Sequence, residues 1–110
     1  MPLDLPKLRK LVALDENDPL SRFALGRKVS ESSNPSDLAE AAGHLLFANA
    51  KAPDHLATYH VLSQVLIRLD RKDEARRVLT QGIERATAVG EGMGRDLAPA
   101  MREMLESLDA

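Results

Sequence analysis

Apolar residues recur at three- and four-residue spacing along almost the whole chain. This spacing places them on one face of an α-helix, whereas the apolar residues of a half-buried strand would alternate with polar ones. No alternation of useful length occurs in the sequence. The pattern therefore predicts an all-α protein in which six helices follow one another.

Polar residues followed by proline mark where two of these helices begin. Asp18-Pro19 and Asn34-Pro35 each place a side-chain oxygen just before the first helical residue, where it can accept hydrogen bonds from free backbone N–H groups. Asp4 is expected to cap the first helix in the same way. The chain is also expected to break at residues 52–54 and to turn at residues 70–73.

The C-terminal part of the chain is expected to differ from the rest. Three glycines within residues 89–94 predict a flexible connection before the last helix. Pro99 lies inside the last apolar segment, and a helix tolerates proline best in its first turn. The last helix is therefore expected to begin near Asp96.

Residues of similar character recur at an interval of 34 positions, in the sets Leu11, Leu45 and Leu79; Leu14, Ala48 and Gly82; Lys7, Ala41 and Ala75; and Pro19 with Pro53. A helix–turn–helix unit of this length is the period of the tetratricopeptide repeat. One copy reads Tyr59-x-x-Leu62-Ser63-x-x-Leu66, followed by Ala75-x-x-x-Leu79 and Gly82. The copy before it reads Arg22-x-x-Leu25-Gly26-x-x-Val29, followed by Ala41-x-x-x-Leu45, Ala48 and Pro53. The chain thus resembles a small tetratricopeptide-repeat protein.

The resemblance covers residues 3–87 and implies a solenoid of helix–turn–helix repeats within one domain. Its expected parts are a half-repeat helix over 3–17, repeats over 18–53 and 54–88, a glycine-rich connection over 89–94 and a capping helix over 95–108. Arg22 stands where the family usually has a large aromatic residue, and Thr87 stands in place of the terminal proline. Leu25 and Leu62 are 37 residues apart, so the turn of the first repeat is longer.

The resemblance also implies a binding surface. In tetratricopeptide repeats the first helix of each pair lines a concave groove that receives peptides or partner segments. The residues expected to face the groove are Leu20, Phe23, Arg27, Glu31, Ala57, His60, Gln64, Ile67 and Arg68. For Phe23 and Ile67 the alternative is that they pack beneath a neighbouring element of the fold.

Composition excludes several other functions. The 110 residues include no cysteine, so disulfides, thiol nucleophiles and cysteine-bound metal centres are excluded. The net charge of -2 argues against binding of nucleic acid. The basic residues within 68–77 are interleaved with acidic ones, and Asp73 is expected to pair with Arg77. No apolar run suits a membrane span or a leader peptide. We expect a cytoplasmic protein without a membrane partner.

The histidines are the remaining candidates for catalysis or metal binding. His44, His55 and His60 form neither a His-Glu-x-x-His motif nor a helical pair at four-residue spacing. No catalytic, cofactor-binding or metal-binding residue is therefore expected, and no cofactor. A catalytic hypothesis would require a pocket that joins His60 to a carboxylate.

Two functional hypotheses follow. The first is a non-enzymatic interaction module that binds a peptide or partner segment in the groove. The alternative is a self-associating structural protein, a homo-oligomer without a peptide ligand, held together by Leu46 and Phe47 on the outer side of the third helix. Aromatic residues make up only 3% of the chain, and Phe23 and Phe47 are the two expected to face something other than their own fold.

Overall fold

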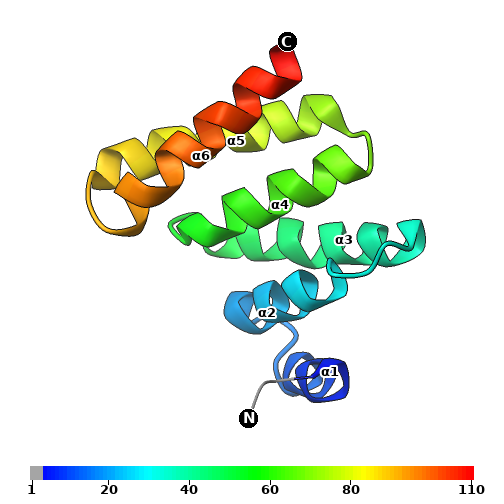
Figure 1. The fold of residues 1–110 in the computed structure, drawn as a ribbon. Coiled ribbons are helices and arrows are strands. Elements are labelled where there is room, and N and C mark those ends of the chain that lie inside the picture. Colours follow the sequence, from blue (N-terminus) through cyan, green and yellow to red (C-terminus); the bar gives the residue numbers. More distant parts are fainter. Residues whose placement is uncertain (1–3) are drawn as a thin grey trace. The chain divides into compact units, whose positions relative to one another are not determined.

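The computed structural model describes residues 4–110, which form helices and no strand (Figure 1). The all-α prediction is confirmed. Residue 3, where the half-repeat was expected to begin, lies outside the described residues. The helices are α1 (Leu5–Leu14), α2 (Pro19–Val29), α3 (Pro35–Lys51), α4 (Leu56–Arg68), α5 (Lys72–Val89) and α6 (Met93–Asp109).

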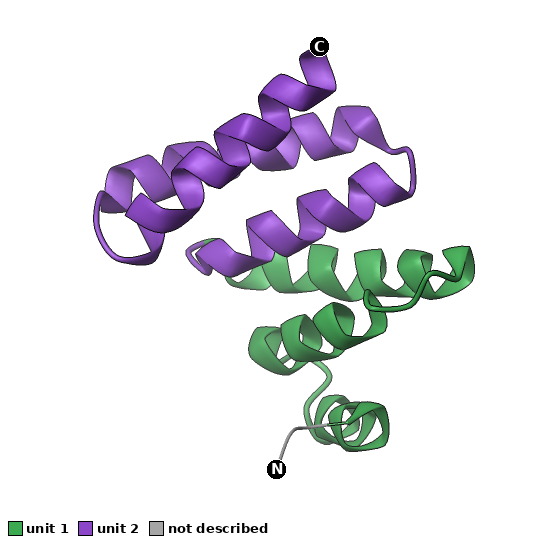
Figure 2. Ribbon diagram, in the orientation of Figure 1, with its two compact units in different colours: residues 1–53 green, residues 54–110 purple. Residues whose placement is uncertain are grey.

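The helices form two compact units, residues 1–53 with α1 to α3 and residues 54–110 with α4 to α6 (Figure 2). In unit 1, α2 packs against both α1 and α3. In unit 2, α5 packs against both α4 and α6, and α6 also contacts α4. Within each unit, consecutive helices therefore pack on one another, which is consistent with a helical repeat. No helix of residues 4–110 is both long and apolar enough to cross a membrane.

The predicted caps of the first three helices are confirmed. The Asp4 carboxylate accepts a hydrogen bond from the backbone N–H of Lys7 at 3.1 Å. Asp18 and Asn34 accept from the backbone N–H groups two residues later, at 3.2 and 2.9 Å. The Ser21 hydroxyl also donates to Asp18 at 2.6 Å, and this bond is the main reason why the pKa of Asp18 is lowered. Local sequence thus fixes these helix starts.

Unit 1 depends on a close approach of α2 and α3. A Cβ atom added at Gly26 would lie 2.9 Å from Cγ of Leu45 and 3.2 Å from the carbonyl oxygen of Ala41. Only glycine permits this distance between the helices. Leu45 is fully buried beside Gly26. On α1, Leu8 and Val12 are also buried and belong to the core of unit 1.

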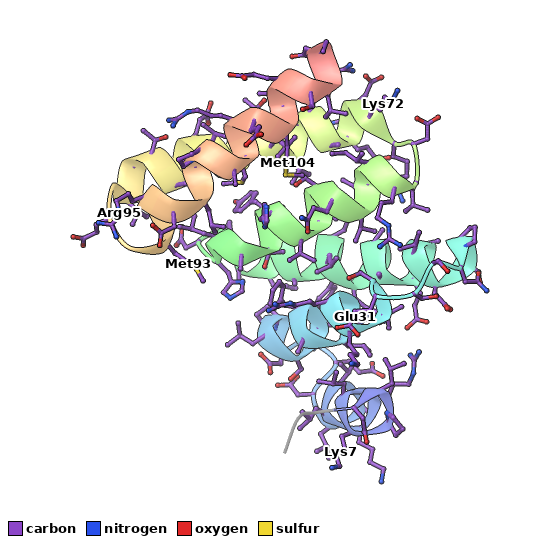
Figure 3. The ribbon with its side chains drawn as sticks, in the orientation of Figure 1. Lys7, Glu31, Lys72, Met93, Arg95 and Met104 are labelled. Atoms are coloured by element: carbon purple, nitrogen blue, oxygen red, sulfur yellow. The ribbon has the colours of Figure 1, made fainter. Side chains whose placement is uncertain are left out.

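Unit 2 has an equivalent crossing at Gly82 on α5. A Cβ atom at Gly82 would lie 2.7 Å from Cβ of Tyr59 on α4 and 2.8 Å from Sδ of Met101 on α6. All three helices therefore meet at this glycine. Tyr59 and Met101 are buried, and the half-buried Met104 lies on the side of α6 that faces α4 (Figure 3).

The expected start of the last helix near Asp96 is wrong. Helix α6 begins at Met93, so Pro99 lies in its second turn and cannot donate a hydrogen bond to the exposed Arg95. The connection is also shorter than expected, because α5 continues to Val89. Gly90, with φ of 72°, caps α5, and Gly92 also has a positive φ of 52°. These two glycines turn the chain back onto α5 within three residues.

A pair of glycine variants tests the crossing at Gly82. Gly82→Ala is expected to lower the free energy of unfolding by about 1–3 kcal/mol, because the methyl group would overlap Tyr59, whose Cβ cannot rotate away. Gly43→Ala is the matched control, since no atom lies within 4 Å of the added Cβ. It should raise stability by about 0.5–1 kcal/mol through helix propensity alone. Urea unfolding of both variants measures this, and a stabilised Gly82→Ala would contradict the packing assigned to α5.

The α3 cap can be tested separately. Asn34→Ala removes the acceptor of the Ser36 N–H and should cost about 1 kcal/mol in the free energy of unfolding. Asn34→Asp keeps an acceptor and adds a negative charge at the helix N-terminus, so its stability should stay close to that of the wild type. Equal losses in both variants, measured by urea unfolding, would argue against the cap.

Candidate functional site

The residues predicted to face a groove lie on one helix in each unit. In unit 1, Leu20, Phe23 and Arg27 belong to α2, and Glu31 follows its last turn. In unit 2, Ala57, His60, Gln64, Ile67 and Arg68 all belong to α4. Gln64 and Arg68 are exposed, whereas Ala57, His60 and Ile67 are half-buried.

A cavity of about 330 Å³ lies against α2 in unit 1. Three residues predicted from the sequence line it, namely Phe23, Arg27 and Glu31. Leu20 is not among its lining residues and is 56% exposed. We call this the α2 cavity, and its complete lining is Leu8, Phe23, Ala24, Arg27, Lys28 and Glu31.

The lining of the α2 cavity is partly apolar and partly charged. Leu8 of α1 and Phe23 supply apolar surface, and Phe23 is half-buried rather than fully packed into the fold. The Lys28 ammonium forms a salt bridge with Glu31 at 3.0 Å. Arg27 is exposed and forms no salt bridge within the described part of unit 1. Its guanidinium is therefore the cation most available to a ligand.

Leu8, Ala24 and Lys28 are the lining residues that sequence reasoning missed. Leu8 belongs to α1 rather than to α2. The spacing of apolar residues predicted only that Leu8 would be buried in the core. Lys28 has a partial signal, because it stands three residues before Glu31 at helical spacing. A second cavity of about 290 Å³ shares both members of this pair and is lined by Leu5, Arg9, Lys28, Val29, Glu31, Ser32 and Asp37.

His60 on α4 lies in a drier environment than a surface histidine. Partial burial lowers its pKa below the usual 6.5, because the charged imidazolium loses hydration. Within unit 2, no carboxylate forms a hydrogen bond or an ion pair with its ring.

The remaining histidines take part in local networks. The His44 ring lies between Glu40, at 3.0 Å from Nε2, and Arg22, at 3.3 Å from Nδ1. Because arginine can only donate, Nδ1 accepts and Nε2 donates to the carboxylate. Arg9 binds the same carboxylate with two nitrogens, and these bonds hold the pKa of Glu40 below its usual value. His55 interacts with the Thr58 hydroxyl at 2.7 Å.

The expected outward patch of Leu46 and Phe47 is only half present. Leu46 is 38% exposed, but Phe47 is half-buried. The Arg22 guanidinium lies 4.6 Å from the centre of the Phe47 ring, and the Lys51 ammonium lies 5.7 Å from it. Phe47 thus has cation partners within its own unit.

Several basic residues at the start of α5 are paired with acids. Asp73 forms an ion pair with Arg76 at 2.7 Å rather than with the expected Arg77, and Arg76 also binds Asp109 of α6 at 2.9 Å. Arg71 pairs with Glu74 at 2.7 Å. Among residues 4–110, no group of three or more histidine or acidic side chains could hold a metal ion.

Comparison with known proteins finds no matching family model, no matching curated protein and no matching solved structure.

The lowered pKa of His60 predicts an acid-sensitive contribution to stability. In the unfolded chain His60 binds its proton near pH 6.5, whereas the folded protein binds it only at lower pH. Stability should therefore fall as the pH drops from 6.5 to the folded pKa, and His60→Gln should remove this part of the loss. An NMR titration of the His60 ring, assigned from the variant spectrum, should give a midpoint below 6.5. A midpoint at or above that value would contradict the burial.

Proposed function

We propose that the chain is a small tetratricopeptide-repeat protein and a non-enzymatic interaction module, which binds a peptide or partner segment on the first helices of its repeats. The observation that carries this proposal is the α2 cavity. Phe23, Arg27 and Glu31 were assigned to a groove from the repeat pattern, and all three line that cavity. The 34-residue interval between residues of α3 and α5 supports the repeat assignment.

The chemistry of the α2 cavity defines the kind of ligand. Leu8 and Phe23 can bury an apolar side chain, and an aromatic residue in a partly open pocket is a common anchor for peptide binding. Arg27 lies one helical turn after Phe23, on the same face, and its guanidinium can bind a carboxylate through two hydrogen bonds. The preferred ligand thus carries an apolar side chain close to an aspartate, a glutamate or a chain terminus.

Helix α4 offers a related but different surface. His60 and Gln64 stand 37 residues after Phe23 and Arg27, so they occupy equivalent places in the second repeat. Neutral imidazole and amide groups replace the aromatic ring and the guanidinium there, because the pKa of His60 is lowered. The α4 surface would bind polar backbone groups rather than charges. We place the module in the cytoplasm, which suits a chain without cysteine.

A random peptide library displayed on phage tests the proposal. Wild-type protein should enrich peptides that carry an apolar residue near Asp or Glu. Phe23→Ala/Arg27→Ala should weaken binding of an enriched peptide about tenfold or more, measured by fluorescence polarisation. The charge reversal Arg27→Glu should abolish the preference for acidic peptides.

The control for this experiment is Met93→Ala/Arg95→Ala, which likewise removes one apolar side chain and one arginine, but on α6 (Figure 3). It should leave peptide affinity unchanged. Circular dichroism and thermal unfolding check that the Phe23→Ala/Arg27→Ala variant is folded. If every enriched peptide binds the folded variant as well as the wild type, the groove assignment is wrong.

A further inference from the structure

Helix α1 has a second apolar face, on the side away from the core of unit 1. Leu11 is 39% exposed and Leu14 is 83% exposed, although Leu8 and Val12 on the other side of the helix are buried. Lys7 and Lys10 are exposed at helical spacing from these leucines. Figure 3 shows Lys7 on the side of α1 that points away from α2. We call Lys7, Lys10, Leu11 and Leu14 the α1 face.

The molecule contains two further copies of this face, and both are covered. Leu45 and Leu79, which stand 34 and 68 residues after Leu11, are both 0% exposed. Ala48 and Gly82, which are the equivalents of Leu14, are buried as well. Leu11 and Leu14 on α1 are therefore exposed, whereas the equivalent residues on α3 and α5 are buried.

In both copies a helix provides the cover, and it is the helix that precedes the face in the chain. On α3 the face lies against α2, where Leu45 and Ala41 meet Gly26. On α5 it lies against α4, where Gly82 meets Tyr59. The structure thus shows twice what kind of element fits these positions. Within the described residues of unit 1, no helix takes that place on α1.

The charge of α1 defines the partner further. The helix carries Lys7, Arg9 and Lys10 and no acidic residue. Arg9 is bound to Glu40, but Lys7 and Lys10 form no salt bridge within the described part of unit 1. His44, the equivalent of Lys10, reaches across to Arg22 on the covering helix. A lysine at this position would therefore meet the covering helix too, where it favours a carboxylate.

We propose that the α1 face is a docking site for an amphipathic helix of a partner protein, in which aspartate or glutamate flanks an apolar stripe. A second copy of α1 fits less well, because pairing through this face would bring four ammonium groups to one interface. The α1 face is distinct from the α2 cavity, because none of its four residues lines that cavity.

Two synthetic peptides of about three heptads test the α1 face, each with leucine at the a and d positions. One carries glutamate at the flanking e and g positions, and the other carries lysine there. The acidic peptide should bind the full chain, and the basic peptide should bind about tenfold more weakly or not at all. Higher salt should weaken the acidic complex. NMR shift changes should concentrate on α1.

Variants separate the apolar and charged parts of the α1 face. Leu11→Glu/Leu14→Glu should weaken the acidic peptide about tenfold or more, and Lys7→Glu/Lys10→Glu should reverse the preference toward the basic peptide. Leu46→Glu/Met93→Glu makes the same charge change at two other exposed apolar positions and should have no effect. Phe23→Ala/Arg27→Ala should also have no effect, so the two proposals fail separately.

Three results would overturn the proposal. One is no binding of the acidic peptide to the wild type. Another is equal binding of that peptide to the wild type and to Lys7→Glu/Lys10→Glu, whose changes lie at exposed positions and keep the fold. The third is a concentration-dependent dimer in light scattering that Leu11→Glu/Leu14→Glu abolishes, because this would assign the α1 face to a second copy.

Discussion

The close approach of helices at Gly26 and Gly82 is the constraint on which both units depend. At each crossing the neighbouring side chains leave no room for a methyl group. Glycine inside a helix costs about 1 kcal/mol relative to alanine, so packing must outweigh propensity at both positions. What the close approach provides is complete burial of Leu45 beside one crossing and of Met101 beside the other. The same crossing at Gly82 also joins α6 to α4 and α5.

Sequence was a good guide wherever the deciding interaction was local. The caps at Asp4, Asp18 and Asn34 involve residues two or three positions away, and the sequence predicted all of them. The start of α6 was not predicted, because the rule for Pro99 considers one helix only. The structure instead favours the longer helix, since Gly94 packs against the carbonyl of Ala86 on α5 and no larger residue would fit there.

In the candidate site, too, the sequence predicted the residues that are placed by local spacing and missed those that are placed by packing between helices. Phe23, Arg27 and Glu31 share one face of a single helical segment, so their spacing predicted their common location. Leu8 joins them only through the packing of α1 on α2, which no spacing within one helix reveals. Phe47 was expected to face outward because the helical period places it on the outer side of the third helix. The Arg22 guanidinium lies over its ring, placed there by the packing of α2 on α3.

The three copies of the repeated helix also differ in how closely a covering helix can approach. Ala41 and Ala75 occupy one edge of the covered faces, and Lys7 takes this place on α1. Leu14 likewise stands where the later copies have Ala48 and Gly82. Larger side chains keep backbones apart, so a helix on the α1 face must lie further from α1 than α4 lies from α5. At the position where α4 presents Tyr59 to Gly82, such a helix must present a smaller residue to Leu14. A helix docked on the α1 face would thus make a looser contact than those inside the fold.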